Sequence, residues 1–295
     1  GSRTRPDSTS LDNHRDEGQG GREHTDNGRS PMVAFDKGPP AALARHFADL
    51  PEIAPEFREL FWYDWGPVFY RGRLTGKARF LGIASDPGPT ERVVCRTLVG
   101  DAGQRVQGFL DKLGLTRSYV LVNAFPVAVH PGKVSKALPL LADEDQLRWR
   151  NRFYDLVTGP ELEAIVAFGG NAARALDLWD GRPDVPTFKV PHPSNPDNKM
   201  LLQKWRTAIP DLRAAVSPDS DGSAGGPNYG STFKESDYAP IPAEDLPFGL
   251  PSWMGDDAWG RRDSPRHNNS VARMSGDLEH TLVWQAPSPQ DLDPS

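Results

Sequence analysis

The sequence predicts an α/β protein, built as a three-layer α/β/α sandwich around a mainly parallel central sheet. Short apolar segments alternate along the chain with helical segments, the order that produces parallel strands joined by crossover helices. The strand segments are apolar almost throughout, as in "ARFLGIAS" at residues 78–85, which is typical of strands covered on both faces. With 295 residues, the chain is long enough for one large domain with appendages.

The first helix is predicted within "PPAALARHFADL", residues 39–50, where Leu43, Phe47 and Leu50 share one face behind an entry proline. The following segment, "FRELFWYDWGPVFYRG" at residues 57–72, is dense in aromatic residues. A core helix and a strand edge explain these rings better than a surface for stacking nucleic-acid bases, although one segment can do both.

Regular alternation of strands and helices then continues to residue 212. The predicted strands are residues 78–85, 119–125, 162–169 and the short segment 186–194. The predicted helices are residues 103–115, 144–157, 170–179 and 198–212. The apolar residues of the helix at 103–115, among them Val106, Phe109 and Leu110, recur at helical spacing and define the face that covers the sheet.

Composition divides the chain into three parts. Residues 1–31 are rich in Gly, Ser, Asp, Asn and Arg without any hydrophobic period, and we expect them to be disordered. Residues 32–217 form the predicted domain and hold 24 Lys and Arg against 21 Asp and Glu. Residues 218–295 hold 5 against 13, and we expect an acidic linker followed by an arm that packs on the domain. The slightly basic middle part is therefore the part suited to nucleic acid.

The sequence also excludes several classes of protein. It has no run of eighteen apolar residues, so no membrane association is expected, and its first residues lack the apolar core of a secretory signal. A single cysteine, Cys95, excludes an internal disulfide and favours a cytoplasmic protein. Neither His130 nor His192 has Cys or acidic residues at metal-ligand spacing, so we expect no metal. We expect a monomer.

Three of the predicted strand ends carry a polar residue: Asp86, Asn123 and His192. Taken singly, Asp86 is more simply a turn former or helix N-cap, and Asn123 a residue that satisfies turn backbone. Prolines on both sides of His192 restrict its loop, which modestly favours a site over a surface histidine. Because parallel sheets place their sites at the carboxyl ends of strands, the convergence of all three predicts a functional site.

The order of the motifs resembles the uracil-DNA glycosylase superfamily. The matching segments are "FLGIASDPG", "VGDAGQ" at residues 99–104, "YVLVNAFP", "AIVAFGGNAARAL" and "VPHPSN", which together extend from Lys77 to Leu212. The similarity is greatest to the bacterial and archaeal families that carry an iron–sulfur cluster. It implies an enzyme of the uracil-DNA glycosylase-like fold that hydrolyses the N-glycosidic bond of uracil or another modified base flipped out of DNA.

The resemblance implies a role for each strand-end residue. Asp86 would orient a water molecule and oppose the positive charge that develops on the sugar. His192 would donate a hydrogen bond to the departing base, and Asn123 would read the edge of the flipped base.

The loop that follows His192 is implied to bind DNA. Ser194 and Asn195, with nearby backbone N–H groups, would hold phosphates. Lys199 and Met200 would act as a wedge in the duplex.

Several positions depart from the family pattern. The cluster cysteines are missing, so the resemblance implies a branch without a cluster, and no cofactor is expected. The first motif lies two residues farther than usual from Val99-Gly100. In one alignment this motif matches Asp86-Pro87-Gly88, and in another alignment it starts at Gly82. The usual base-stacking aromatic falls at Leu98, so Phe125 or an N-terminal aromatic residue would have to stack on the base.

The substrate stays open at this level. Gly88 takes the place of the bulky residue that blocks the C5 side of the base in strict uracil enzymes, so a 5-substituted pyrimidine is compatible with the sequence. One alternative is therefore an anti-phage defence enzyme that excises a hypermodified pyrimidine. Alternatives from other classes are a non-catalytic DNA-binding module and a nucleoside or nucleotide hydrolase.

Overall fold

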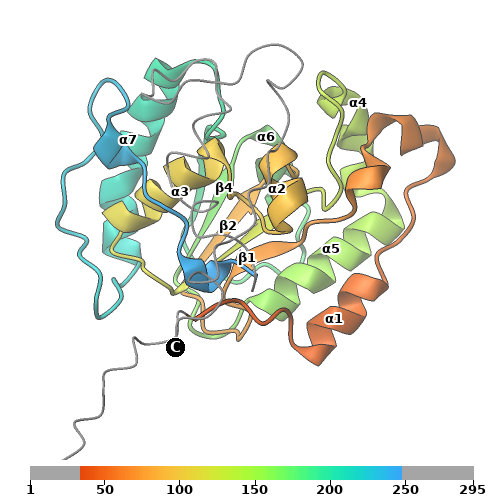
Figure 1. Ribbon diagram of the computed structural model, residues 1–295, viewed down its shortest axis with the longest axis horizontal. Helices are drawn as coiled ribbons and strands as arrows, with labels where there is room; N and C mark the ends of the chain where they lie inside the picture. Colours follow the sequence, from red (N-terminus) through yellow and green to blue (C-terminus); the bar gives the residue numbers. More distant parts are fainter. Residues whose placement is uncertain (1–33, 248–295) are drawn as a thin grey trace, which may run out of the picture.

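A computed structural model describes residues 34–247 and shows an α/β fold with a five-stranded, mostly parallel sheet (Figure 1). The strand order is β1-β3-β2-β4-β5. Strands β2 to β5 are mutually parallel, and β1 pairs antiparallel with β3 at one edge. The strands are β1 (Tyr70–Gly72), β2 (Phe80–Ala84), β3 (Tyr119–Asn123), β4 (Ala164–Phe168) and β5 (Thr187–Val190).

Helices and short 3-10 turns connect the strands. The α-helices are α1 (Ala41–Ala48), α2 (Pro89–Val94), α3 (Asp101–Lys112), α4 (Val134–Ala137), α5 (Glu144–Val157), α6 (Gly170–Asp177) and α7 (Asn198–Ala215). The 3-10 helices are η1 (Pro55–Leu60), η2 (Tyr63–Trp65), η3 (Leu138–Ala142), η4 (Glu235–Asp237) and η5 (Ala243–Asp245). None of the helices between residues 34 and 247 is long and apolar enough to cross a membrane.

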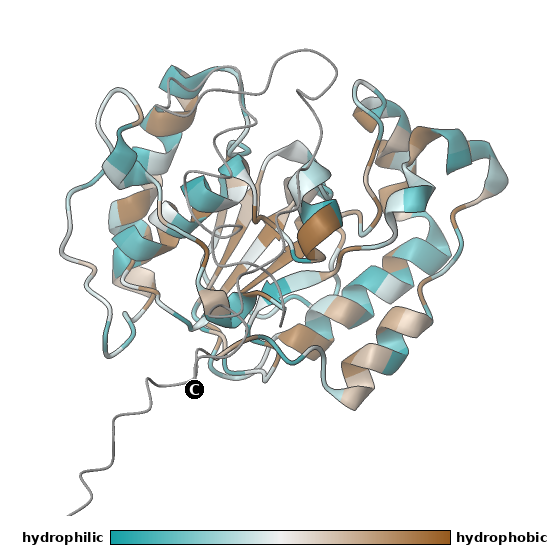
Figure 2. Cartoon of the chain, viewed as in Figure 1, coloured by the Kyte–Doolittle hydropathy of each residue, from teal (hydrophilic) through white to brown (hydrophobic). Residues whose placement is uncertain are grey.

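The sheet is covered on both faces, as the continuous apolar strands require. Leu81 and Ile83 of β2 pack into the cluster formed with α1, α5 and α6, whereas Phe80 and Ala84 point to the cluster formed with α3 and α7. Figure 1 shows α3 and α7 on one side of the sheet and α1 and α5 on the other. The hydrophobic residues are concentrated in the strands and on the helix faces turned toward them (Figure 2). The helices thus form two outer layers around the sheet.

Strand β2 is the point at which the order of the sheet reverses. The chain runs from β2 to β3 on one side and then crosses to β4 and β5 on the other. Such a reversal separates the loops that leave the neighbouring strands and opens a crevice at their carboxyl ends. The loop that begins at Ser85 leaves β2 at this position, directly between β3 and β4.

The predicted elements in the alternating part of the chain all form. The helix predicted at 144–157 has the same bounds as α5, because Asp143 caps its first turn by accepting the N–H of Gln146. The strand predicted at 186–194 is shorter, because Pro191 and Pro193 cannot donate to a ladder.

The aromatic segment at residues 57–72 differs from the prediction. In place of a core helix it forms two 3-10 turns, η1 and η2, followed by the edge strand β1. Gly66, at φ +72°, and Pro67 end η2 and prevent helical continuation.

Residues 218–247 run first along α3 and α7 and then along the edge strand β1, and buried charges tie them to the domain. Asp245 pairs with Arg71 at 3.0 Å, and Asp237 pairs with Lys112 at 2.9 Å. Asp219 accepts the backbone N–H groups of residues 116–118, which form the turn before β3. The first part of the predicted arm therefore packs on the domain, whereas the predictions for residues 1–31 and 248–295 lie outside the described residues.

Candidate active site

Asp86 lies in the loop directly after β2, held by two hydrogen bonds. The hydroxyl of Ser85 donates to its Oδ1 at 2.6 Å, and the backbone N–H of Val129 donates to its Oδ2 at 3.0 Å. Burial raises the pKa of this carboxyl group above its usual value, and the two hydrogen bonds oppose that rise. A carboxylate with a raised pKa, just beyond the carboxyl end of the central strand β2, is suited to act as a general base.

A third side chain fixes the orientation of Asp86. The amide of Asn171, in the first turn of α6, donates to the Ser85 hydroxyl at 2.8 Å. Because that hydroxyl accepts from Asn171, its own proton is directed at Asp86. The hydrogen bonds that join Asn171, Ser85 and Asp86 were not predicted from the sequence. Two signals could have indicated them: the polar Ser85 beside Asp86, and the "GGN" turn at the start of α6.

His192 lies in the loop after β5 and is held as a neutral imidazole. The backbone N–H of Ser194 donates to Nδ1 at 3.2 Å, which places the proton of the neutral ring on Nε2. Burial lowers the pKa of His192 to about 4. The side chain therefore offers one N–H donor without a positive charge at neutral pH.

The turn between β4 and α6 connects these two residues. Gly169, at φ +95°, packs so closely on His192 that a Cβ there would lie 3.0 Å from the His192 Cβ. Two residues later, Asn171 contacts Ser85. The positive φ and the close contact both require glycine at position 169. The loop after β5 and the loop after β2 therefore both contact the turn between β4 and α6.

Asn123 is the last residue of β3 and pairs in register with Ala84 of β2. Its amide nitrogen donates to the hydroxyl of Thr97 at 3.3 Å, and its backbone carbonyl accepts from the Tyr154 hydroxyl at 3.2 Å. These contacts fix the side chain at the same edge of the sheet as Asp86. Asp86, Asn123 and His192 all lie at or just beyond the carboxyl ends of strands, as the sequence predicts.

Gly88 caps α2 and faces a buried carboxylate. A Cβ at Gly88 would lie 2.7 Å from Oε2 of Glu91, the atom that accepts the Gly88 N–H. The other oxygen of Glu91 accepts the N–H groups of Val99 and Gly100 at 2.8 and 3.3 Å. Glu91, which was not predicted as a site residue, thus joins the first motif to the Val-Gly segment.

Leu98 and Phe125, the two predicted stacking residues, are both buried. Leu98 is 5% exposed and has φ +57°, and its carbonyl group lies against Gly103. Phe125 is 3% exposed and packs edge-on against Phe61 at 5.8 Å between ring centroids. Neither the Phe125 ring nor the Leu98 side chain is open to solvent.

The predicted DNA-binding residues lie between His192 and the start of α7. Ser194 and Lys199 are exposed, and Met200 is half-buried in the first turn of the helix. Asn195 accepts the N–H of Asp197, so its side chain shapes the loop. Arg105 of α3 donates to the Pro193 carbonyl at 2.8 Å and holds this loop against the domain.

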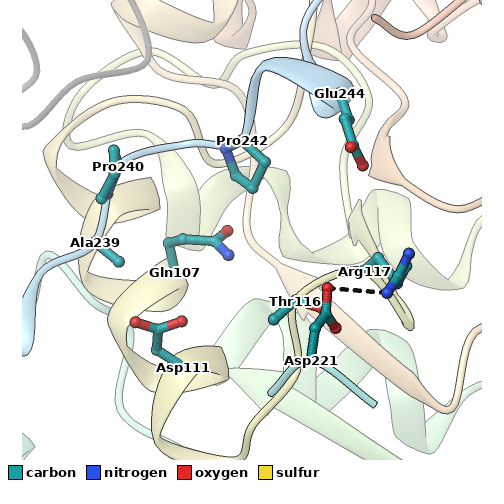
Figure 3. A pocket seen from close by; sticks show the side chains of 9 residues that line it. All are labelled: Gln107, Asp111, Thr116, Arg117, Asp221, Ala239, Pro240, Pro242 and Glu244. Atoms are coloured by element: carbon teal, nitrogen blue, oxygen red, sulfur yellow. Dashed lines mark hydrogen bonds and ion pairs between the residues drawn. The ribbon is translucent and has the colours of Figure 1, made fainter. Parts of the chain in front are cut away.

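A pocket of about 360 Å³ lies at the other end of the sheet. Figure 3 shows that its walls come from α3, the turn before β3 and the arm, with Arg117 paired to Asp221 across it. It is lined by Gln107, Asp111, Thr116, Arg117, Asp221, Ala239, Pro240, Pro242 and Glu244. Because none of the strand-end residues borders it, we place the candidate active site at the carboxyl ends instead.

Among residues 34–247, no group of three or more His, Cys, Asp or Glu side chains is placed to hold a metal ion. No family model matches the chain, and the search of curated proteins gave no significant match.

The depressed pKa of His192 predicts a pH-dependent stability. The unfolded chain has this pKa near 6.5, so between pH 6.5 and about 4 the unfolded state binds a proton that the native state does not. This contribution therefore lowers the free energy of unfolding as the pH falls through that range. Urea denaturation should show that the free energy of unfolding decreases less between pH 7 and pH 4.5 in His192→Gln than in the unmodified protein. Equal losses of stability in both proteins would contradict the neutral imidazole of His192.

Proposed function

We propose that the protein is a DNA glycosylase that hydrolyses the N-glycosidic bond of uracil or another modified base flipped out of DNA. The observation that carries the proposal is that a half-buried, oriented carboxylate and a neutral N–H donor both lie at the carboxyl ends of the strands. Asp86 supplies the carboxylate and His192 the donor. The matched order of motifs and the mostly parallel sheet support a uracil-DNA glycosylase-like fold.

The chemistry of base excision fits these two groups. As the bond to the base breaks, positive charge develops on the sugar and negative charge on the base. Asp86 opposes the positive charge and orients the attacking water molecule. The Nε2–H of His192 donates to the base oxygen on which negative charge accumulates, and the imidazole is neutral at pH 7 when it does so.

Asn123 is the proposed reader of the base edge. Its amide offers both a donor and an acceptor, the combination needed for the edge of a pyrimidine. The hydrogen bond to the buried Thr97 hydroxyl fixes the orientation of the amide, so only one arrangement of donor and acceptor faces the base. Discrimination among bases then follows from the pairing of buried polar groups.

The base must enter where Leu98 and Phe125 are now buried. Both residues are at most 5% exposed, so the proposal requires the loops after β2 and β3 to separate when a base enters. Glu91 connects the Gly88 turn to Val99 and Gly100, and these parts of the wall would move together. The loop at Ser194 and Lys199 is the proposed contact to the DNA backbone.

The proposal is tested by incubating the full chain with DNA that carries different bases. The panel contains uracil, thymine and pyrimidines with large 5-substituents, in single and double strands, and alkali then cleaves the DNA at abasic sites. Cleavage at one type of base supports a glycosylase and names its substrate. No cleavage, with DNA binding retained, would favour the non-catalytic module.

His192→Ala should lower the excision rate constant by about 10²-fold, as expected for loss of one oxyanion-type donor worth ~3 kcal/mol. His192→Gln is the matched control, because its amide can replace the N–H donor and should retain more activity. Single-turnover excision on the preferred base measures both. An unchanged rate in His192→Ala, together with a lower melting temperature, would make the imidazole structural.

A further inference from the structure

Four planar side chains form a row on the surface beside Asp86. The ring centroids of His130 and Trp62 are 3.9 Å apart, and those of Trp62 and Trp65 are 5.4 Å apart with an interplanar angle of 10°. The guanidinium of Arg92 lies over the ring of Trp65, 5.4 Å from its centroid. We call these four residues the aromatic platform.

The platform is attached to the loops that carry the candidate active site. Val129, which donates its N–H to Asp86, directly precedes His130. Arg92 belongs to α2, the helix that begins three residues after Asp86. Trp62 donates its backbone N–H to the carbonyl of Ala128 at 2.9 Å. The row of rings thus connects the loop after β2 with the loop after β3.

These rings are not part of the core. Trp62, Trp65 and His130 are half-buried and Arg92 is exposed, whereas other aromatic side chains, such as Phe153 at 2% exposure, lie inside the domain. The neighbouring Tyr63 is 43% exposed. Large aromatic side chains that keep part of their surface in water commonly mark an interaction site.

The charges around the platform are mixed. Lys133 and Lys136 are exposed at and near the start of α4, which packs against η1, and Figure 1 shows α4 beside this segment. With Arg92 they provide three cations, against the exposed Asp64 of η2 and the exposed Glu56 and Glu59 of η1. Because these charges balance, we expect a partner bound mainly by stacking, with a smaller contribution from phosphate contacts.

We infer that the platform binds unpaired bases next to the excised one, so that the enzyme takes its target from single-stranded DNA. Trp62 is covered by His130 and Trp65, so the face of Trp65 under Arg92 is the one that a base can take. Bases in a duplex are stacked on each other and cannot offer a face to Trp65, whereas unpaired bases can. Arg92 already covers a ring as a base would, and its guanidinium can pair with a phosphate when a base displaces it. The inference rests on the proposed function, since it assigns a form of substrate to that site.

The test measures, by fluorescence anisotropy, the affinity of the full chain for a labelled oligothymidylate that contains no excisable base. Trp65→Ala should weaken this binding by at least about 5-fold, given ~1–3 kcal/mol per stacked base, and should leave binding to the matching duplex unchanged. The indole fluorescence of the unmodified protein should be quenched on binding. With three cations, the logarithm of the affinity should fall with the logarithm of salt concentration at a slope of about −2.

Two variants serve as controls. Trp65→Phe keeps a ring and should retain most of the affinity, which separates stacking from a folding defect. Phe188→Ala removes a half-buried ring on the edge strand β5 and should leave binding to single strands unchanged.

Each outcome decides the inference. Equal weakening on single strands and duplex would overturn the preference for unpaired bases, and unchanged binding in Trp65→Ala would overturn the platform itself. Asp86→Asn should still bind the oligothymidylate, because this variant loses the proposed catalytic carboxylate and keeps the aromatic platform. If the unmodified protein excises no base while the Trp65→Ala defect persists, the proposed function fails and the platform stands.

Discussion

Asp86→Asn should lower the rate constant of base excision by about 10²-fold or more. An amide cannot accept the proton of the attacking water or oppose the positive charge on the sugar. The fold should remain, because Asn is isosteric and loses at most one of the two hydrogen bonds that Asp86 accepts from Ser85 and Val129, at a cost of about 1 kcal/mol. Single-turnover excision and thermal melting measure the two effects separately.

Ser85→Ala is the matched control for this prediction. It removes the hydroxyl that orients the carboxylate and leaves the carboxylate itself, so its loss should be smaller, on the order of 10-fold, consistent with one lost hydrogen bond. If Asp86→Asn retains the normal rate and melts at a lower temperature, the side chain serves to accept the Val129 N–H in a turn. That result would favour the alignment that starts at Gly82.

Asp245→Ala should lower the free energy of unfolding by about 3–5 kcal/mol. It removes the carboxylate that pairs with the fully buried Arg71 and accepts from the Tyr119 hydroxyl at 2.6 Å, and the guanidinium would remain buried without its counter-ion. The carboxylate is 2% exposed, so water cannot replace it without opening the structure. Urea denaturation of the full chain measures the loss.

Glu244→Ala provides the comparison for Asp245→Ala. Glu244 is the preceding residue and pairs with Arg73 at 2.9 Å, but its side chain is 51% exposed. Loss of such a surface pair should cost at most about 1 kcal/mol. Equal and small losses in both variants would show that the arm contributes little to stability.

The arm also contacts the proposed site through Arg71. That guanidinium donates to the carbonyl of Thr97 at 3.1 Å, and the Thr97 hydroxyl accepts from Asn123. Asp245 is therefore three contacts away from Asn123, the proposed reader of the base. The sequence predicts an acidic arm that packs on the domain, and the contact that Asp245 makes there is a buried ion pair with the edge strand.

The sequence by itself determined the α/β class and the strands and helices predicted between residues 78 and 212, whereas α2, α4 and η3 in the same range were not predicted. Short apolar runs such as residues 119–123 favour strands covered on both faces, and the period of α3 and α5 gives the helix faces that cover them. The same local pattern places Asp86, Asn123 and His192 at the strand ends, since side chains that interrupt an apolar run mark where the strand leaves the core. These are properties of short segments, and the sequence displays them directly.

The tertiary structure alone decided which of these side chains work together. Asn171 orients Ser85, from which it is separated by 86 positions in the sequence. Gly169 has a positive φ and packs against His192. Glu91 accepts backbone N–H groups on both sides of α2. Trp62 and His130 likewise meet only because β1 is antiparallel to β3, which brings the segment before β1 to the loop after β3. Contacts of this kind depend on the strand order and on backbone angles that no local period encodes, because the same apolar segments are compatible with several sheet orders.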